Sequence, residues 1–157
     1  NAKDLLPKNP ETVPVAIGDK LDLITTAFSL GMLPSGATDP YALRRNAQGV
    51  TQLILGLRLP LDLRELTETA IRVLDEQQSL DLDRTKIQEE LLELLLQRHR
   101  WFFQERGIRY DLIDAVLQIT EDDRPSISNK GNAILPVKKL ELAEYLSTHL
   151  ETEQNFG

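Results

Sequence analysis

Residues 39–57 read DPYALRRNAQGVTQLILGL, and this stretch carries the clearest structural signal in the chain. Its apolar positions follow one another at spacings of 4, 3, 4 and 3, and they are Leu43, Ala47, Val50, Ile54 and Leu57. These spacings place all five on one face of an α-helix. Asp39 and Pro40 are typical of a helix start, and Pro60 is typical of a stop. The stretch predicts an amphipathic helix over residues 39–57.

The sequence on both sides of this stretch also predicts helices. Leu occurs 29 times against 16 for Ile and Val together, and Leu keeps more rotamer freedom in a helix than β-branched residues do. Apolar periodicity predicts further helices over residues 10–30, 62–79, 83–106, 111–120 and 137–153. Residues 121–136 hold turn formers and predict a linker. We expect an all-α fold, a five- to six-helix bundle with a Leu-rich core.

Individual ends and faces of these helices are also predicted. Asp62 and Glu65 have the spacing of a capping box, and Gly107 suits the position just after the helix over 83–106. The inward face of the helix that starts at Asp62 is expected to carry Leu63, Leu66, Ala70, Val73 and Leu74.

The amino-acid composition excludes several classes of protein. The chain has 157 residues, suited to one domain or slightly more, and no cysteine, which excludes disulfides, thiolate zinc sites and a cysteine nucleophile. The net charge of −7 excludes a uniformly basic nucleic-acid-binding domain. Apolar runs are too short to span a membrane, and the start does not resemble a signal peptide. The chain lacks an initiator Met, so we interpret it as part of a longer protein. The absence of cysteine fits a cytoplasmic location.

The charge is unevenly distributed along the chain. Residues 39–58 carry a net +2 and residues 97–110 a net +3, so the remainder carries −12. Every basic residue in these two stretches is an arginine, namely Arg44, Arg45, Arg58, Arg98, Arg100, Arg106 and Arg109. Guanidinium groups bind phosphate oxygens and stack on bases, so the stretches could hold an RNA backbone. Solvated helix faces with internal ion pairs are the alternative, and charge alone favours that alternative.

Catalytic motifs are absent from the sequence. The two histidines, His99 and His149, are 50 residues apart, and no nucleophile elbow or phosphate-binding glycine loop is present. His99 lies between two arginines, and we interpret it as a surface residue of its helix. We therefore expect no catalytic residue in this chain.

Residues 15–23 (VAIGDKLDL) resemble the last helix of HD-type phosphohydrolase domains. In that family a helical Asp joins upstream histidines to hold a divalent metal, and the matching position here is Asp19. No histidine precedes His99, and one carboxylate cannot hold such a metal alone. We therefore expect Asp19 to serve as a cap or to pair with Lys20, Arg44 or Arg45, and we expect no metal site.

A longer stretch, residues 18–50, reads GDKLDLITTAFSLGMLPSGATDPYALRRNAQGV and resembles the bacterial glycyl-tRNA synthetase β subunit family. That family carries an Ala-Asp-Lys-Leu-Asp helix, a Leu-Pro-Thr/Ser-Gly turn and an Asp-Pro-Phe/Tyr-Ala-Leu-Arg-Arg segment. Residues 107–111 (GIRYD) and 114–116 (DAV) supply a second match in the expected order. The resemblance covers about residues 5–120, with Gly18 in place of the usual Ala. Beyond residue 121 we find no match.

The resemblance implies a domain organisation for this chain and separate roles for the two subunits of the enzyme. Residues 1–58 would form the C-terminal part of a degenerate HD-like helical domain, residues 59–120 a following helical region, and 121–157 a linker and terminal helix. In that family the α subunit handles glycine and ATP, and the β subunit binds tRNA-Gly and supports the α/β heterotetramer. This portion would be non-catalytic and hold no cofactor, with tRNA contacts at Arg44, Arg45, Arg98, Arg100 and Arg109.

Alternatives remain open from the sequence. Arg44 and Arg45 could pair internally with Asp19 or Asp22, or they could contact a tRNA phosphate. The whole chain could be the remnant of an HD-type metal-dependent phosphohydrolase. It could also be an acidic helical adaptor without a role in RNA binding.

Overall fold

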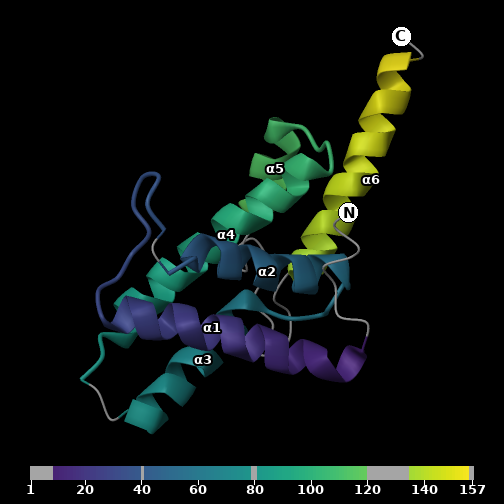
Figure 1. The fold of residues 1–157 in the computed structure, drawn as a ribbon. Helices are drawn as coiled ribbons and strands as arrows, with labels where there is room; N and C mark the ends of the chain where they lie inside the picture. Colours follow the sequence, from purple (N-terminus) through teal and green to yellow (C-terminus); the bar gives the residue numbers. More distant parts are fainter. Residues whose placement is uncertain (1–8, 40, 79–80, 120–134, 156–157) are drawn as a thin grey trace, which may run out of the picture.

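The computed structural model describes residues 9–39, 41–78, 81–119 and 135–155 (Figure 1). Within these ranges the chain forms six α-helices and a short 3-10 helix, and it forms no strand. The elements in order are η2 Pro10–Thr12, α1 Val13–Ser29, α2 Leu43–Gly56, α3 Leu63–Gln78, α4 Arg84–Glu105, α5 Tyr110–Leu117 and α6 Pro136–Asn155. The expected all-α class and helix number are confirmed. The predicted linker, residues 121–136, lies almost wholly outside the described residues.

Helix starts are fixed by short polar side chains, as predicted for Asp62. Asn9 Oδ1 accepts from the Glu11 amide at 3.0 Å, ahead of η2. Asp62 Oδ1 accepts from the Arg64 amide at 2.7 Å, and Asp83 Oδ1 accepts from the Lys86 amide at 3.2 Å. Each bond satisfies an amide that has no partner inside its own helix.

Helix α2 begins later than predicted. Ala42 has a left-handed φ of 52°, so the backbone turns sharply there and the regular helix starts at Leu43. Asp39 still caps the helix from a distance, because its two carboxylate oxygens accept from the Leu43 and Arg44 amides at 2.7 and 2.9 Å. Pro40, which was expected to start the helix, lies outside the described residues.

The helices share one apolar core. Helix α1 packs against α2, α3 and α4, while α5 packs against α4 and α6. The core includes fully buried side chains from both ends of this arrangement, among them Ile24, Ile54, Leu91 and Leu140. The proposed division at residues 58 and 120 stays a prediction about the family's domains. Among the described helices, none is both long and apolar enough to cross a lipid bilayer.

Helix α3 turns a different face inward from the one predicted. Its buried side chains are Leu63, Thr67, Ile71 and Leu74. The expected inward residues Leu66 and Ala70 are only partly buried, and Val73 is 39% exposed. The prediction was right for Leu63 and Leu74 and wrong for the other three residues, because a pattern of apolar residues alone leaves out Thr67. The Thr67 hydroxyl donates to the Arg64 carbonyl at 3.0 Å, and this hydrogen bond lowers the free-energy cost of burying Thr67.

Helix α6 extends past the other helices at its C-terminal end (Figure 1). Near its middle, Glu144 lies 3.3 Å from the Arg58 guanidinium and 3.9 Å from that of Arg106. Arg58 follows the end of α2 with a left-handed φ of 52°, and Arg106 follows the end of α4. One glutamate of α6 therefore contacts the ends of two other helices.

Candidate RNA-binding surface

The first turn of α2 presents two arginines without internal partners. Arg44 is partly exposed and Arg45 is exposed. Neither side chain forms an ion pair or hydrogen bond with another described residue. Positive charge in the first turn also opposes the helix dipole. Because Asp39 already occupies the amides of this helix start, the available donors for an incoming anion are the guanidinium groups themselves.

Lys20 of α1 joins this part of the molecule, which the sequence analysis did not predict. A Cβ built on Gly49 of α2 would lie 2.8 Å from Lys20 Cε, so the Lys20 stem lies directly across Gly49. Gly49 follows Arg45 by one helical turn, which places the two on the same side of α2. We call Lys20, Arg44 and Arg45 the α2 basic surface. Glycine at position 49 was the available signal, because a helix position without a side chain allows a residue of a neighbouring helix to lie across it.

The second predicted stretch is built around a buried histidine. His99 is 1% exposed, so its interpretation as a surface residue was wrong. Its Nδ1 lies 2.7 Å from the Leu95 carbonyl oxygen and 3.1 Å from Thr51 Oγ1 of α2. A carbonyl oxygen only accepts, so the ring proton resides on Nδ1. The helical spacing of Leu91, Leu95 and His99 was the available signal.

Burial keeps this histidine neutral. Its Nε2 is buried and has no hydrogen-bond partner among the described residues. Desolvation, with a smaller contribution from the positive charge of Lys139, lowers the pKa of His99 to about 4, although the bond to the Leu95 carbonyl opposes this shift. His99 therefore contributes packing and a helix-to-helix contact rather than charge.

Arg98 and Arg100 lie on opposite flanks of α4. Successive residues in a helix are separated by about 100°, so side chains on either side of the inward-facing His99 diverge. Arg100 is paired with Asp114 of α5, and both side chains are about half exposed. Arg98 has a buried Nε without a partner in the described part of the chain. The two arginines therefore do not form one continuous surface.

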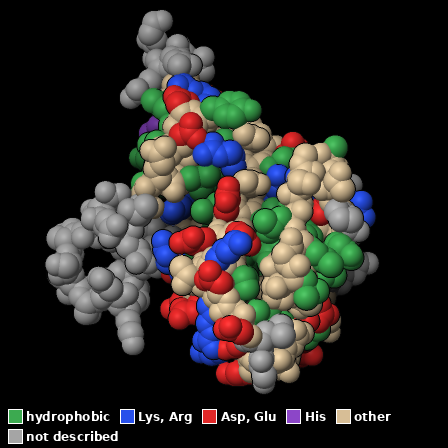
Figure 2. Space-filling view, turned by 90° about the vertical axis from the view of Figure 1, so that its left-hand side faces the viewer, with side chains coloured by type: hydrophobic (Ala, Val, Ile, Leu, Met, Phe, Trp, Pro, Cys, Tyr) green, Lys and Arg blue, Asp and Glu red, His purple; other side chains and the backbone are tan. Residues whose placement is uncertain are grey.

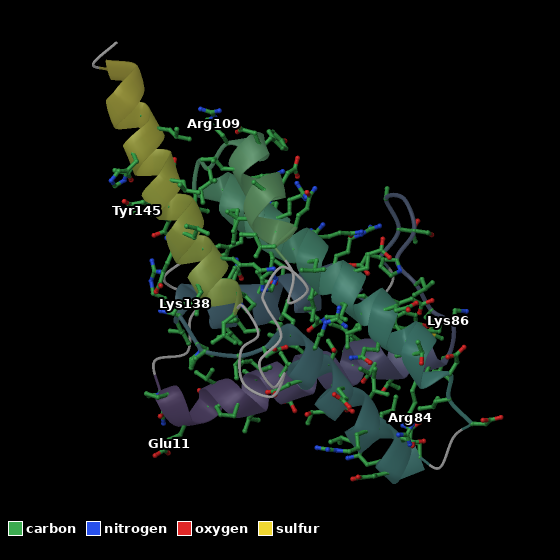
Figure 3. The ribbon with its side chains drawn as sticks, turned by 180° about the vertical axis from the view of Figure 1, so that it is seen from behind. Glu11, Arg84, Lys86, Arg109, Lys138 and Tyr145 are labelled. Atoms are coloured by element: carbon green, nitrogen blue, oxygen red, sulfur yellow. The ribbon has the colours of Figure 1, made fainter. Side chains whose placement is uncertain are left out.

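Arg109, at the start of α5, is also paired. Its Nε lies 3.1 Å from Asp111 Oδ1, and its Nη2 lies 2.5 Å from the other carboxylate oxygen. The hydrogen bond and the charge of Asp111 raise the pKa of Arg109, and the hydrogen bond from Arg109 lowers the pKa of Asp111. Figure 3 shows Arg109 at the opposite end of the molecule from Arg84 and Lys86, at the start of α4.

The structure thus divides the seven arginines of the two basic stretches. Four have an acidic partner, namely Arg58, Arg100, Arg106 and Arg109. Within the described ranges, Arg44, Arg45 and Arg98 have none. The face shown in Figure 2 mixes basic and acidic side chains closely among the coloured residues. An uninterrupted basic area of the kind that grips nucleic acid without selectivity is not visible on that face.

Asp19 lies exposed on α1, away from the core. It forms no ion pair with Lys20, Arg44 or Arg45 in the described structure, and Asp22 forms none either. The internal pairing expected for Arg44 and Arg45 is therefore not seen. The described residues also contain no group of three His, Asp or Glu side chains placed to hold a metal ion.

Comparison with known proteins identifies the chain's relatives. A family model described as glycyl-tRNA synthetase beta subunit matches residues 1–118. A glycine–tRNA ligase beta subunit of Halothermothrix orenii is 40% identical over 136 residues, covering 87% of this chain and 19% of that protein. One of Desulforamulus reducens is 33% identical over 156 residues, covering 99% of this chain and 22% of that protein.

These matches place the chain among subunits of aminoacyl-tRNA synthetases. Within that class, it belongs to the glycyl-tRNA synthetase β subunit family. The chain spans about a fifth of the length of the curated relatives it matches. The expectation of no resemblance beyond residue 121 was too restrictive, because the Desulforamulus reducens protein aligns over 156 residues of this chain.

Proposed function

We propose that this chain is a non-catalytic tRNA-binding and assembly portion of a glycyl-tRNA synthetase β subunit. It would act in the cytoplasm, within an α/β heterotetramer whose α subunit uses ATP to attach glycine to tRNA-Gly. Membership of the glycyl-tRNA synthetase β subunit family supports the proposal that the chain is part of such an enzyme. The tRNA contact within this chain is assigned to the α2 basic surface, Lys20, Arg44 and Arg45, with Arg98 as a further candidate.

The observation that carries the proposal is the state of Arg44 and Arg45. Two guanidinium groups stand in the first turn of α2, where the helix dipole disfavours them. The Asp39 carboxylate at this helix start accepts from backbone amides, and no described carboxylate forms an ion pair with either guanidinium. A phosphate of bound RNA would supply the missing negative charge and form charge-assisted hydrogen bonds. Arg100 and Arg109, also predicted from sequence, support the proposal less well because their guanidinium groups are already paired.

The proposal is tested on the α/β holoenzyme with Arg44→Gln and Arg45→Gln combined. Binding of tRNA-Gly is measured by fluorescence anisotropy over a series of salt concentrations. Each lost phosphate contact is expected to weaken binding on the order of tenfold, and the pair should flatten the salt slope by about 1.5. Glycine-dependent ATP–pyrophosphate exchange, which requires no tRNA, should be unchanged.

A matched control carries Arg64→Gln and Arg72→Gln on α3. Both residues are exposed and lack an ion pair in the described structure, so the control removes the same charge from another surface. Equal salt slopes for the two double variants would contradict a specific role for the α2 basic surface. An unchanged slope in both would favour the acidic-adaptor alternative for this portion of the subunit.

A further inference from the structure

An open apolar groove runs between α1 and α3. It has a volume of about 650 Å³ and begins at Pro10, in η2. The first half of α1 forms one wall, α3 forms the other, and residues 57–61 contribute between them. Asp22 is the one charged residue among the described residues that line it.

Both walls carry apolar side chains that the described residues cover only in part or leave exposed. On α3 these are Leu66, Ala70 and Val73, which recur at helical spacing beside the true inward face. On α1, the lining residue Pro14 is exposed, although Ile24 and Phe28 of the same helix lie deep in the core. A helix that is apolar on both sides is typically buried on both sides. The walls therefore have the character of an interface rather than of a solvated surface.

The chemistry of the groove restricts its occupant. A lining with a single charge, and that charge negative, offers nothing to the phosphates of RNA. Depletion of charge is characteristic of permanently buried interfaces rather than of transient ones. Two helical walls accept a third helix between them, packed through its apolar ridges.

We propose that an amphipathic helix from the remainder of the β subunit, outside these 157 residues, occupies the groove, with a basic residue opposite Asp22. The inference rests on the proposed function, because it takes the chain to be part of a β subunit. Relatives are about five times longer than this chain, so they contain ample further sequence. A segment of the same polypeptide also docks without the entropy loss of bringing two molecules together.

The experiment measures thiol accessibility in the intact β subunit. Val73→Cys places a thiol in the groove, and Arg72→Cys places one on the neighbouring exposed position of α3. This region contains no native cysteine, so peptide mass spectrometry follows each thiol separately as it reacts with N-ethylmaleimide. The groove thiol is expected to react at least tenfold more slowly than the control thiol, without α subunit or tRNA.

Three results would overturn the proposal. Equal rates would mean that the groove is open. Protection that arises only when α subunit is added would assign the groove to that subunit, and protection that rises with β subunit concentration would assign it to a second copy. If Val73→Cys lowers the melting temperature, hydroxyl-radical oxidation of Leu66 and Val73 in the unsubstituted subunit supplies the same comparison. Because tRNA is absent, failure of the tRNA-binding proposal would leave these rates unchanged.

Discussion

The two arginine-rich stretches look alike in sequence but differ in the folded chain. In residues 39–58, Arg44 and Arg45 remain without acidic partners among the described residues, and only Arg58 is paired. In residues 97–110, Arg100, Arg106 and Arg109 have acidic partners, and only Arg98 has none in the described structure. A count of charges along the chain cannot distinguish arginines that serve the fold from arginines that remain available to a ligand.

The difference arises from what each stretch is packed against. The second stretch surrounds His99, which contacts Thr51 of α2 and is buried between the helices. Arg100, Arg106 and Arg109 consequently emerge beside α5 and α6, where carboxylates lie within reach. At the start of α2, the Asp39 carboxylate accepts from backbone amides and pairs with neither arginine side chain. We therefore expect changes in the second stretch to reduce stability, and changes in the first to reduce RNA affinity.

The largest expected effect concerns His99 and pH. Because its pKa is about 4 in the folded chain and near 6.5 when unfolded, the unfolded chain binds the extra proton between these values. Acidification through this window should therefore destabilise the fold, by about 3 kcal/mol in total. Urea unfolding at several pH values measures the effect, which is clearest between pH 5 and 6.5, above most carboxylate titrations. The His99→Gln variant should lack this slope, and a flat wild-type profile would show that His99 is accessible to protons.

A smaller loss of stability is expected from Arg100→Gln. This change removes the ion pair with Asp114, whose side chains are 40% and 50% exposed, and should cost about 0.5–1 kcal/mol. Thermal unfolding of Arg100→Gln, Asp114→Asn and the double variant isolates the coupling between them. The salt slope of tRNA binding should not change. A flattened slope would mean that Arg100 exchanges Asp114 for a phosphate, which would erase the distinction between the two stretches.

Helix positions were predictable from the sequence because the signals are local. Caps such as Asn9, Asp62 and Asp83 bond to amides two or three residues away, and leucine periodicity reports the inward face directly. The face of α3 was misjudged because Thr67 satisfies its hydroxyl within its own helix. A polar residue of that kind can be buried without any signal in the pattern of apolar residues.

The candidate site was only partly predictable because ion pairing is not local. Arg100 and Asp114 are 14 residues apart, and Arg58 and Glu144 are 86 apart. Neither pairing follows from the helical period. The position of Lys20 against Gly49, one helical turn after Arg45, likewise depends on how closely α1 approaches α2. The sequence therefore identifies the candidate arginines, and the fold shows which of them have acidic partners.

A still smaller effect is expected from Gly49→Ala. The new methyl group would lie 2.8 Å from Lys20 Cε, and the flexible Lys20 stem must move away. A helical Gly-to-Ala change otherwise favours folding by about 0.5–1 kcal/mol, so we expect a net change of a few tenths. The tRNA salt slope should flatten by less than about 1 if Lys20 contacts phosphate. Gly18→Ala, where nothing lies within 4 Å, is the control that should stabilise α1 and leave the slope unchanged.

The smallest effect is the titration of Asp111, and it probes whether Arg109 is engaged in solution. The hydrogen bond from Arg109 lowers the pKa of Asp111, so its contribution to stability is present above the unfolded pKa and is lost as the pH falls through the folded pKa. Replacing Arg109 by Gln should raise the pKa of Asp111 back toward its ordinary value. Carbon-13 NMR of the Asp111 carboxyl group between pH 2 and 6 measures this change. An unchanged pKa would mean that the Arg109 guanidinium is free of Asp111. Arg109 would then resemble Arg44 and Arg45, and the second stretch would regain a place in RNA binding.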